Sequence, residues 1–110
     1  RVVSICTADI GIIAAKKYDI EAWSPREKVY YEIGSNSNCT AYQATRLNVK
    51  YQNKKGDREY VHTLNNTAIA TSRTMRAIIE NYQQEDGSIK VPEVLVKYMN
   101  GKKIIKKDKE

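Results

Sequence analysis

The sequence predicts an α+β fold, in which an antiparallel β-sheet is followed by a long helix in the C-terminal half. Short segments with alternating or β-branched apolar residues fill the first part of the chain, and the clearest helical stripe comes after them. Strands in succession, followed by a helix, are typical of α+β domains and not of alternating βαβ units.

Three segments near the start are expected to be strands. Residues 2–6 are rich in β-branched side chains, and residues 17–23 alternate apolar and polar side chains with the period of two that a strand requires. Residues 29–33 are expected to form a hairpin with the second segment across a loop at residues 24–28. The small polar residues 34–38 are prone to turns, which predicts another loop.

The next part of the chain predicts a second hairpin. Residues 42–51 are expected to be mostly extended after a short helical turn, and residues 54–58 to form a charged hairpin tip. Residues 60–64 are then the return strand.

A helical period follows. Its apolar residues fall at i, i+3, i+4 and i+7 and form one stripe, made of Met75, Ile78, Ile79 and Tyr82. Gly87 and then Pro92 end this run, and residues 92–99 are expected to form a short terminal helix with proline in its first turn.

The composition narrows the functional classes. The 110 residues are one domain or part of one, and their formal net charge of +6 favours an anionic partner, although simple solubility explains the same excess. Two cysteines are too few for a disulfide scaffold, and together with one histidine they show no ligand spacing of a zinc site. The low cysteine count agrees with a reduced cytoplasmic compartment. No apolar run approaches the ~20 residues of a membrane helix. The chain opens inside a strand-like run without methionine, so we expect it to be cut from something longer.

The segment from Asn65 to Arg73 is the first candidate site. Alternate residues of an extended chain point the same way, so Asn65 and Thr67 would share one face. Arg73 comes where the strand gives way to the helix, and both an arginine and the free N–H groups of a helix N-terminus bind phosphate. From spacing alone, a polar turn with a solvated Arg73 is the commoner arrangement.

Carboxylates form two further candidates. Glu32 and the hydroxyl of Ser35 are hard oxygen ligands that suit nucleotide-bound Mg²⁺, although an ordinary loop is commoner. Asp19 and Glu21 share a strand face and could be paired carboxylates, but the solvated side of a half-exposed strand is the commoner interpretation. His62 has no nearby nucleophile in a known spacing, and we assign it no role.

Six short motifs occur in order along the chain. They are T-A-D-I-G (7–11), A-A-K-K-Y-D-I-E-A-W (14–23), E-I-G-S-N-S-N (32–38), Y-Q-A-T-R-L (42–47), V-H-T-L-N (61–65) and I-E-N-Y-Q (79–83). In this order and spacing they resemble the seryl-tRNA synthetases, a family of class II aminoacyl-tRNA synthetases. The resemblance implies that residues 1–99 are the C-terminal portion of a catalytic domain, and that residues 100–110 are a basic C-terminal tail.

The resemblance also implies roles for single residues. Arg73 matches the motif 3 arginine, which in the family contacts the γ-phosphate of ATP. Asn65 and Thr67 match residues that help to hold the substrate serine. Glu32 and Ser35 match the pair that reaches the Mg²⁺ bound to ATP. The activity implied for the full-length enzyme, a homodimer, is activation of serine with ATP and its transfer to tRNA.

Some features of the family pattern are changed or missing. Departures from the commoner family residues occur at Gly34, Asn36, Thr45, Asn66 and Ala68, and none removes a named ligand. The dimer-forming motif 1, the motif 2 arginine and the tRNA-binding coiled coil are not in these 110 residues, so we expect little or no activity from them alone. The alternatives are a binding or regulatory module that works with a separate chain, a paralogue that charges a carrier protein and, more weakly, a small basic RNA-binding domain.

Overall fold

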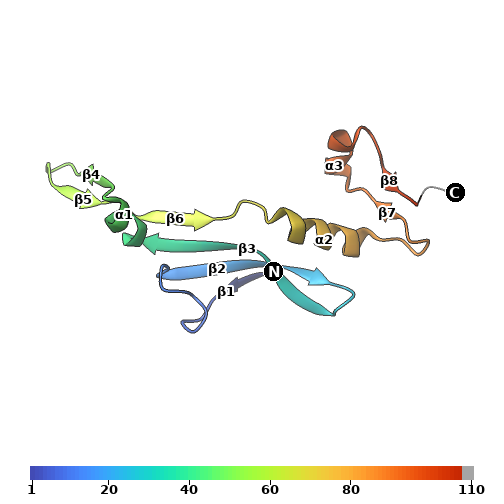
Figure 1. Cartoon of the computed structure of the whole chain (residues 1–110), viewed down its shortest axis with the longest axis horizontal. Helices are drawn as coiled ribbons and strands as arrows, with labels where there is room; N and C mark the ends of the chain where they lie inside the picture. Colours follow the sequence, from blue (N-terminus) through green and yellow to red (C-terminus); the bar gives the residue numbers. More distant parts are fainter. Residues whose placement is uncertain (108–110) are drawn as a thin grey trace. The chain divides into compact units, whose positions relative to one another are not determined.

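The computed structural model describes residues 1–107, which form two compact units (Figure 1). The first unit contains residues 1–21 and 32–70, and the second contains residues 22–31 and the described chain from residue 71. In chain order the elements are β1 (Val2–Ser4), β2 (Lys16–Ser24), β3 (Val29–Thr40), α1 (Tyr42–Leu47), β4 (Lys50–Gln52), β5 (Arg58–Tyr60), β6 (Thr63–Asn66), α2 (Thr71–Tyr82), β7 (Ile89–Lys90), α3 (Glu93–Val96), the 3₁₀ helix η1 (Lys97–Met99) and β8 (Ile104–Ile105).

The main sheet has the strand order β1-β2-β3-β6. The outer pairs are antiparallel: Val3 lies opposite Asp19 in the pair β1–β2, and Ser37 lies opposite Asn65 in the pair β3–β6. The antiparallel sheet that the sequence predicts is therefore confirmed. The far ends of β2 and β3 extend into residues 22–31 and belong to the second unit.

The loop predicted at residues 34–38 is wrong. These residues continue β3 as far as Thr40, and β6 pairs with residues 36–38 of this run, which gives their backbone groups partners. Asn36 lies opposite Asn66, and the register shifts only after Asn38, where a bulge precedes Thr40. Long-range pairing thus outweighs the turn preference of small polar residues.

The second hairpin differs from the prediction in two places. Residues 42–47 form helix α1 and not an extended segment, and Asn48 ends that helix in the left-handed conformation, with φ of 54°. Strands β4 and β5 then pair across the predicted charged tip (Figure 1), and Gly56 in that tip has φ of +91°. The return strand predicted at residues 60–64 is split into β5 and β6, since residues 61–62 belong to neither.

The C-terminal elements agree better with the sequence. Helix α2 carries the predicted stripe, but its 12 residues make it a helix of average length, so the expected long helix is not found. The short terminal helix appears as α3 followed by η1. Within the predicted tail, β8 pairs with β7, and residues 108–110 lie outside the described residues.

Strand β2 exposes its apolar side and shelters its polar side. Tyr18 and Ile20 are 38% and 43% exposed, whereas Asp19 is only 6% exposed. One oxygen of Asp19 (Oδ1) lies 3.6 Å from the Nζ of Lys17, and Glu21 forms an ion pair of 2.6 Å with Arg1. The solvated face expected for Asp19 is therefore wrong, and the polar face of β2 is the sheltered one. No helix in the described part is long and apolar enough to cross a membrane.

Candidate functional site

The first unit brings four of the predicted site residues onto neighbouring strands. Glu32 and Ser35 lie on β3 and are half-buried, whereas Asn65 on β6 and Thr67 just beyond it are exposed. A Cβ added at Gly34 would lie 3.6 Å from the backbone oxygen of Thr67, so Thr67 lies beside this part of β3. The pairing of β3 with β6 thus places both candidate groups in one region of the sheet.

Glu32 and Ser35 together offer oxygen ligands for a hard cation. They are three positions apart, a spacing that places side chains on opposite faces of a regular strand. Residues 1–107 contain no group of three or more His, Cys, Asp or Glu side chains that could hold a metal. Each oxygen donor is of a kind that suits a Mg²⁺ ion arriving with phosphate ligands of its own, since Mg²⁺ takes few protein ligands, but the regular strand spacing does not bring the two donors onto one face.

Asn65 and Thr67 offer hydrogen-bonding groups at the end of β6. Asn65 carries an amide, which both donates and accepts, and Thr67 carries a hydroxyl, which does the same. Both side chains are exposed in the described structure. The pair can therefore recognise a small polar ligand by its hydroxyl or amino group.

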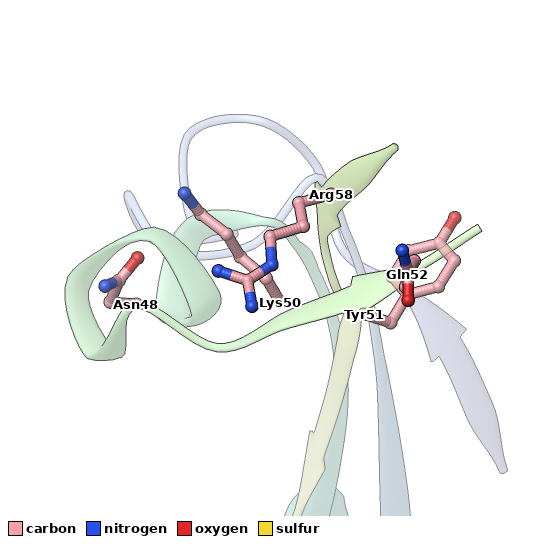
Figure 2. A pocket seen from close by; sticks show the side chains of 5 residues that line it. All are labelled: Asn48, Lys50, Tyr51, Gln52 and Arg58. Atoms are coloured by element: carbon pink, nitrogen blue, oxygen red, sulfur yellow. The ribbon is translucent and has the colours of Figure 1, made fainter. Parts of the chain in front are cut away.

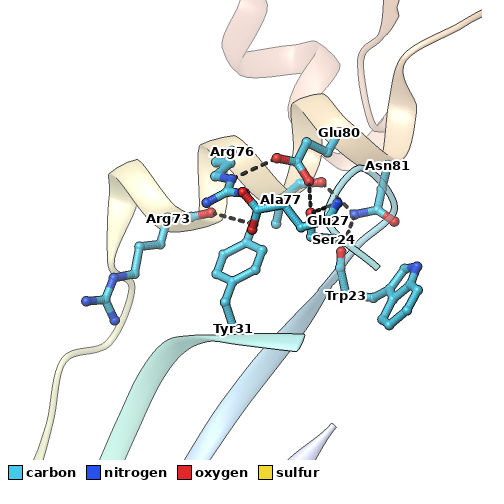
Figure 3. Close-up of polar contacts among 9 residues, drawn as sticks. All are labelled: Trp23, Ser24, Glu27, Tyr31, Arg73, Arg76, Ala77, Glu80 and Asn81. Atoms are coloured by element: carbon cyan, nitrogen blue, oxygen red, sulfur yellow. Dashed lines mark hydrogen bonds and ion pairs between the residues drawn. The ribbon is translucent and has the colours of Figure 1, made fainter. Parts of the chain in front are cut away.

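Arg73 belongs to the second unit, where it is the third residue of α2. Its backbone oxygen accepts a hydrogen bond of 3.4 Å from the Tyr31 hydroxyl, and its side chain is exposed. Figure 3 shows the guanidinium extending away from the polar contacts that α2 makes elsewhere. A guanidinium on the first turn of a helix is a suitable donor for phosphate oxygens.

A polar network fixes α2 against the hairpin of residues 22–31 (Figure 3). Glu80 accepts a hydrogen bond of 2.5 Å from the fully buried Ser24, and it forms an ion pair of 2.7 Å with Arg76. Arg76 also lies 2.8 Å from a carboxylate oxygen of Glu27. The hydrogen bond from Ser24, followed by that from Arg76, lowers the pKa of Glu80, and the hydrogen bonds to Glu80 and Glu27 raise the pKa of Arg76. The network holds the helix whose first turn carries Arg73.

The sequence analysis missed this network. Arg76 and Glu80 are an i, i+4 pair, a signal that the sequence does contain. Ser24 and Glu80 are 56 positions apart, and no local pattern joins them.

Replacing Glu80 by glutamine is expected to remove an acid-sensitive part of the protein's stability. Because the pKa of Glu80 is lowered in the folded state, its charged form stabilises the fold above the ordinary value of 4.5, and this contribution is lost as the pH falls below it. Thermal unfolding measured between about pH 3 and 7 should show a weaker loss of stability on acidification in E80Q than in the wild type. The matched control is Glu85→Gln at an exposed position, which should keep the acid sensitivity of the wild type. Equal acid sensitivity of the wild type and E80Q would contradict the stabilising role of the Glu80 carboxylate.

Comparison with known protein sequences identifies the family of this chain. The family described as the tRNA synthetase class II core domain (G, H, P, S and T) matches residues 1–82. The chain belongs to the class II tRNA synthetase core-domain family. It is 68% identical over 103 residues to the serine–tRNA ligase of Methanocella arvoryzae, and 54% identical over 111 residues to that of Pyrococcus abyssi. These matches cover 92% and 100% of the chain but 24% of each relative, so this family member spans about a quarter of their length.

Solved structures agree with this class II assignment. A seryl-tRNA synthetase from Pyrococcus horikoshii complexed with ATP matches 96% of the chain and 24% of its own length, with a TM-score of 0.89 and 56% identity. The cytoplasmic serine–tRNA ligase of Naegleria fowleri in complex with AMP matches 96% of the chain and 22% of its own length, with a TM-score of 0.85 and 50% identity. The predicted resemblance to seryl-tRNA synthetases and the α+β fold class are confirmed.

Proposed function

We propose that this chain is part of a serine–tRNA ligase, which activates serine with ATP to seryl-adenylate and pyrophosphate and then transfers the seryl group to tRNA. The observation that supports the proposal is the pairing of β3 with β6, in which the backbone oxygen of Thr67 approaches Gly34, between Glu32 and Ser35, in a fold whose solved relative is complexed with ATP. In the first step the serine carboxylate attacks the α-phosphorus and pyrophosphate leaves. In the second step a tRNA hydroxyl attacks the seryl carbonyl and AMP leaves.

Each site residue has one task in this proposal. Arg73 holds the distal phosphates of ATP through the two parallel hydrogen bonds that a guanidinium can donate. The family resemblance assigns Glu32 and Ser35 to the Mg²⁺ that accompanies ATP; they would hold that ion, which would neutralise phosphate charge. Asn65 and Thr67 position serine through its polar groups, so that the carboxylate lies in line for attack.

The complete ligase is proposed to be a cytoplasmic homodimer with serine, tRNA and ATP–Mg²⁺ as its ligands. The relatives, which are serine–tRNA ligases of about four times the length of this chain, support serine and tRNA as ligands, and the solved relatives with ATP and AMP support a nucleotide. The homodimer, the cytoplasmic location and Mg²⁺ rest on the family resemblance alone. The chain's division into residues 1–99, as the C-terminal portion of the catalytic domain, and residues 100–110, as a basic tail, also stays a prediction.

Serine-dependent exchange of pyrophosphate into ATP tests the proposal. The complete ligase should catalyse this exchange and should also charge tRNA, whereas the isolated 110 residues should show little or no turnover. The reason is that charge at the α-phosphate needs donors that we expect from motif 2, outside these residues. Turnover by the isolated chain would contradict this division of the site. Exchange without tRNA charging would favour a carrier-protein substrate, and absence of serine-dependent exchange would exclude the ligase.

A further inference from the structure

The hairpin of β4 and β5 has a cationic face. Lys50 lies opposite Tyr60 and Gln52 lies opposite Arg58, so strand alternation places all four on the same face. Figure 2 shows the side chains of Lys50 and Arg58 extending to the same side of the hairpin. These two cations line a hollow of about 350 Å³ whose other lining residues are Asn48, Tyr51 and Gln52, and none of its lining side chains is acidic.

The carboxylates of the hairpin accept hydrogen bonds from neutral side chains and not from Lys50 or Arg58. Glu59 accepts hydrogen bonds from the Tyr51 hydroxyl at 2.7 Å and from Asn53 at 2.6 Å. Asp57 accepts a longer hydrogen bond of 3.4 Å from Asn53. Within the described chain, neither Lys50 nor Arg58 forms an ion pair with a carboxylate. Two like charges therefore converge in one hollow without an acidic partner.

The ligand that this arrangement suits is a chain of phosphate groups. The hollow is open and polar, and Lys54 and Lys55 continue the positive charge to the tip of the same hairpin. A row of cations along a ribbon fits a polymer with one negative charge per unit better than it fits a single nucleotide. The Nζ of Lys50 also lies 4.7 Å from the centre of the Tyr60 ring, which supports that cation without neutralising it.

We propose that the β4–β5 hairpin binds the backbone phosphates of RNA through Lys50 and Arg58. This inference rests on the proposed function, in which the RNA is the tRNA substrate. Phosphate contacts position an RNA but carry no sequence information. The hairpin is thus a positioning surface for the tRNA, separate from the residues assigned to ATP and serine.

Tests of this surface use the complete ligase and the double variant K50A/R58A. The slope of log Kd for tRNA against log salt should become shallower by about 2, one unit for each cation removed. The KM for tRNA should rise, while serine-dependent pyrophosphate exchange without tRNA should stay at the wild-type rate. The charge-keeping variant K50R/R58K should bind tRNA as the wild type does.

A matched variant separates this surface from general charge. K90A/K97A also removes two positive charges, but from exposed positions in the second unit. It should leave the salt slope and the KM for tRNA unchanged. An equal loss in both double variants would overturn the proposal, and so would an unchanged slope in K50A/R58A. Loss of exchange without tRNA in K50A/R58A would overturn it as well, because the hairpin would then be structural. If the wild type shows no serine-dependent exchange, the proposed function fails, and the salt slope still tests RNA binding by the hairpin.

Discussion

Replacing Arg73 by alanine is expected to lower serine-dependent pyrophosphate exchange by the complete ligase about 10²–10³-fold, the loss typical of removing one positioned donor to a developing charge. The guanidinium donates two parallel hydrogen bonds to phosphate oxygens, and its place on the first turn of α2 adds the favourable end of the helix dipole. The loss should lie mainly in kcat/KM for ATP. Steady-state exchange assays with ATP and serine varied in turn measure it.

Two controls identify the cause of this loss. Arg73→Lys keeps the charge but not the planar fork of donors, so it should recover only part of the activity. Arg26→Ala removes an exposed arginine from the hairpin of the same unit and should have little effect on exchange. Unchanged adenylation by R73A would refute the role of Arg73, and an equal loss in R26A would show that the effect is one of general charge.

Local periodicity predicted β2 and α2, because the pattern of each element lies within its own residues. Residues 17–23 alternate with period two, and the structure makes them the centre of β2. The α2 stripe is equally local. Residues 34–38 could not be predicted in the same way, because their partner is β6, which comes about 30 positions later. Only that pairing turns a run of small polar residues into a strand.

Only part of the candidate site could be predicted from the sequence. Spacing alone favoured a solvated Arg73 and an ordinary loop at Glu32. The order of the six motifs along the chain reversed that preference. The register that places Thr67 beside Gly34 is long-range and had no local signal. Asp19 shows the same limit, since alternation assigned it to a face but could not tell which face is sheltered.

Replacing Thr67 by valine is expected to weaken the discrimination of serine from alanine about 10- to 100-fold, which is the effect of losing one hydrogen bond to a substrate hydroxyl. Valine has nearly the shape of threonine but has no hydroxyl. Because Thr67 is exposed beyond the end of β6, the substitution should not disturb the packing of the sheet. The ratio of kcat/KM for serine to that for alanine, measured by pyrophosphate exchange, gives the result.

The direction of this change separates recognition from a structural role. Loss of a recognition group should lower kcat/KM for serine and leave that for alanine nearly unchanged, because alanine has no hydroxyl to bind. Thr67→Ser retains the hydroxyl and should keep most of the discrimination. An equal fall for both amino acids in T67V would instead show that Thr67 supports the end of β6. In that case Asn65, the other residue assigned to serine, would be the next candidate for serine recognition.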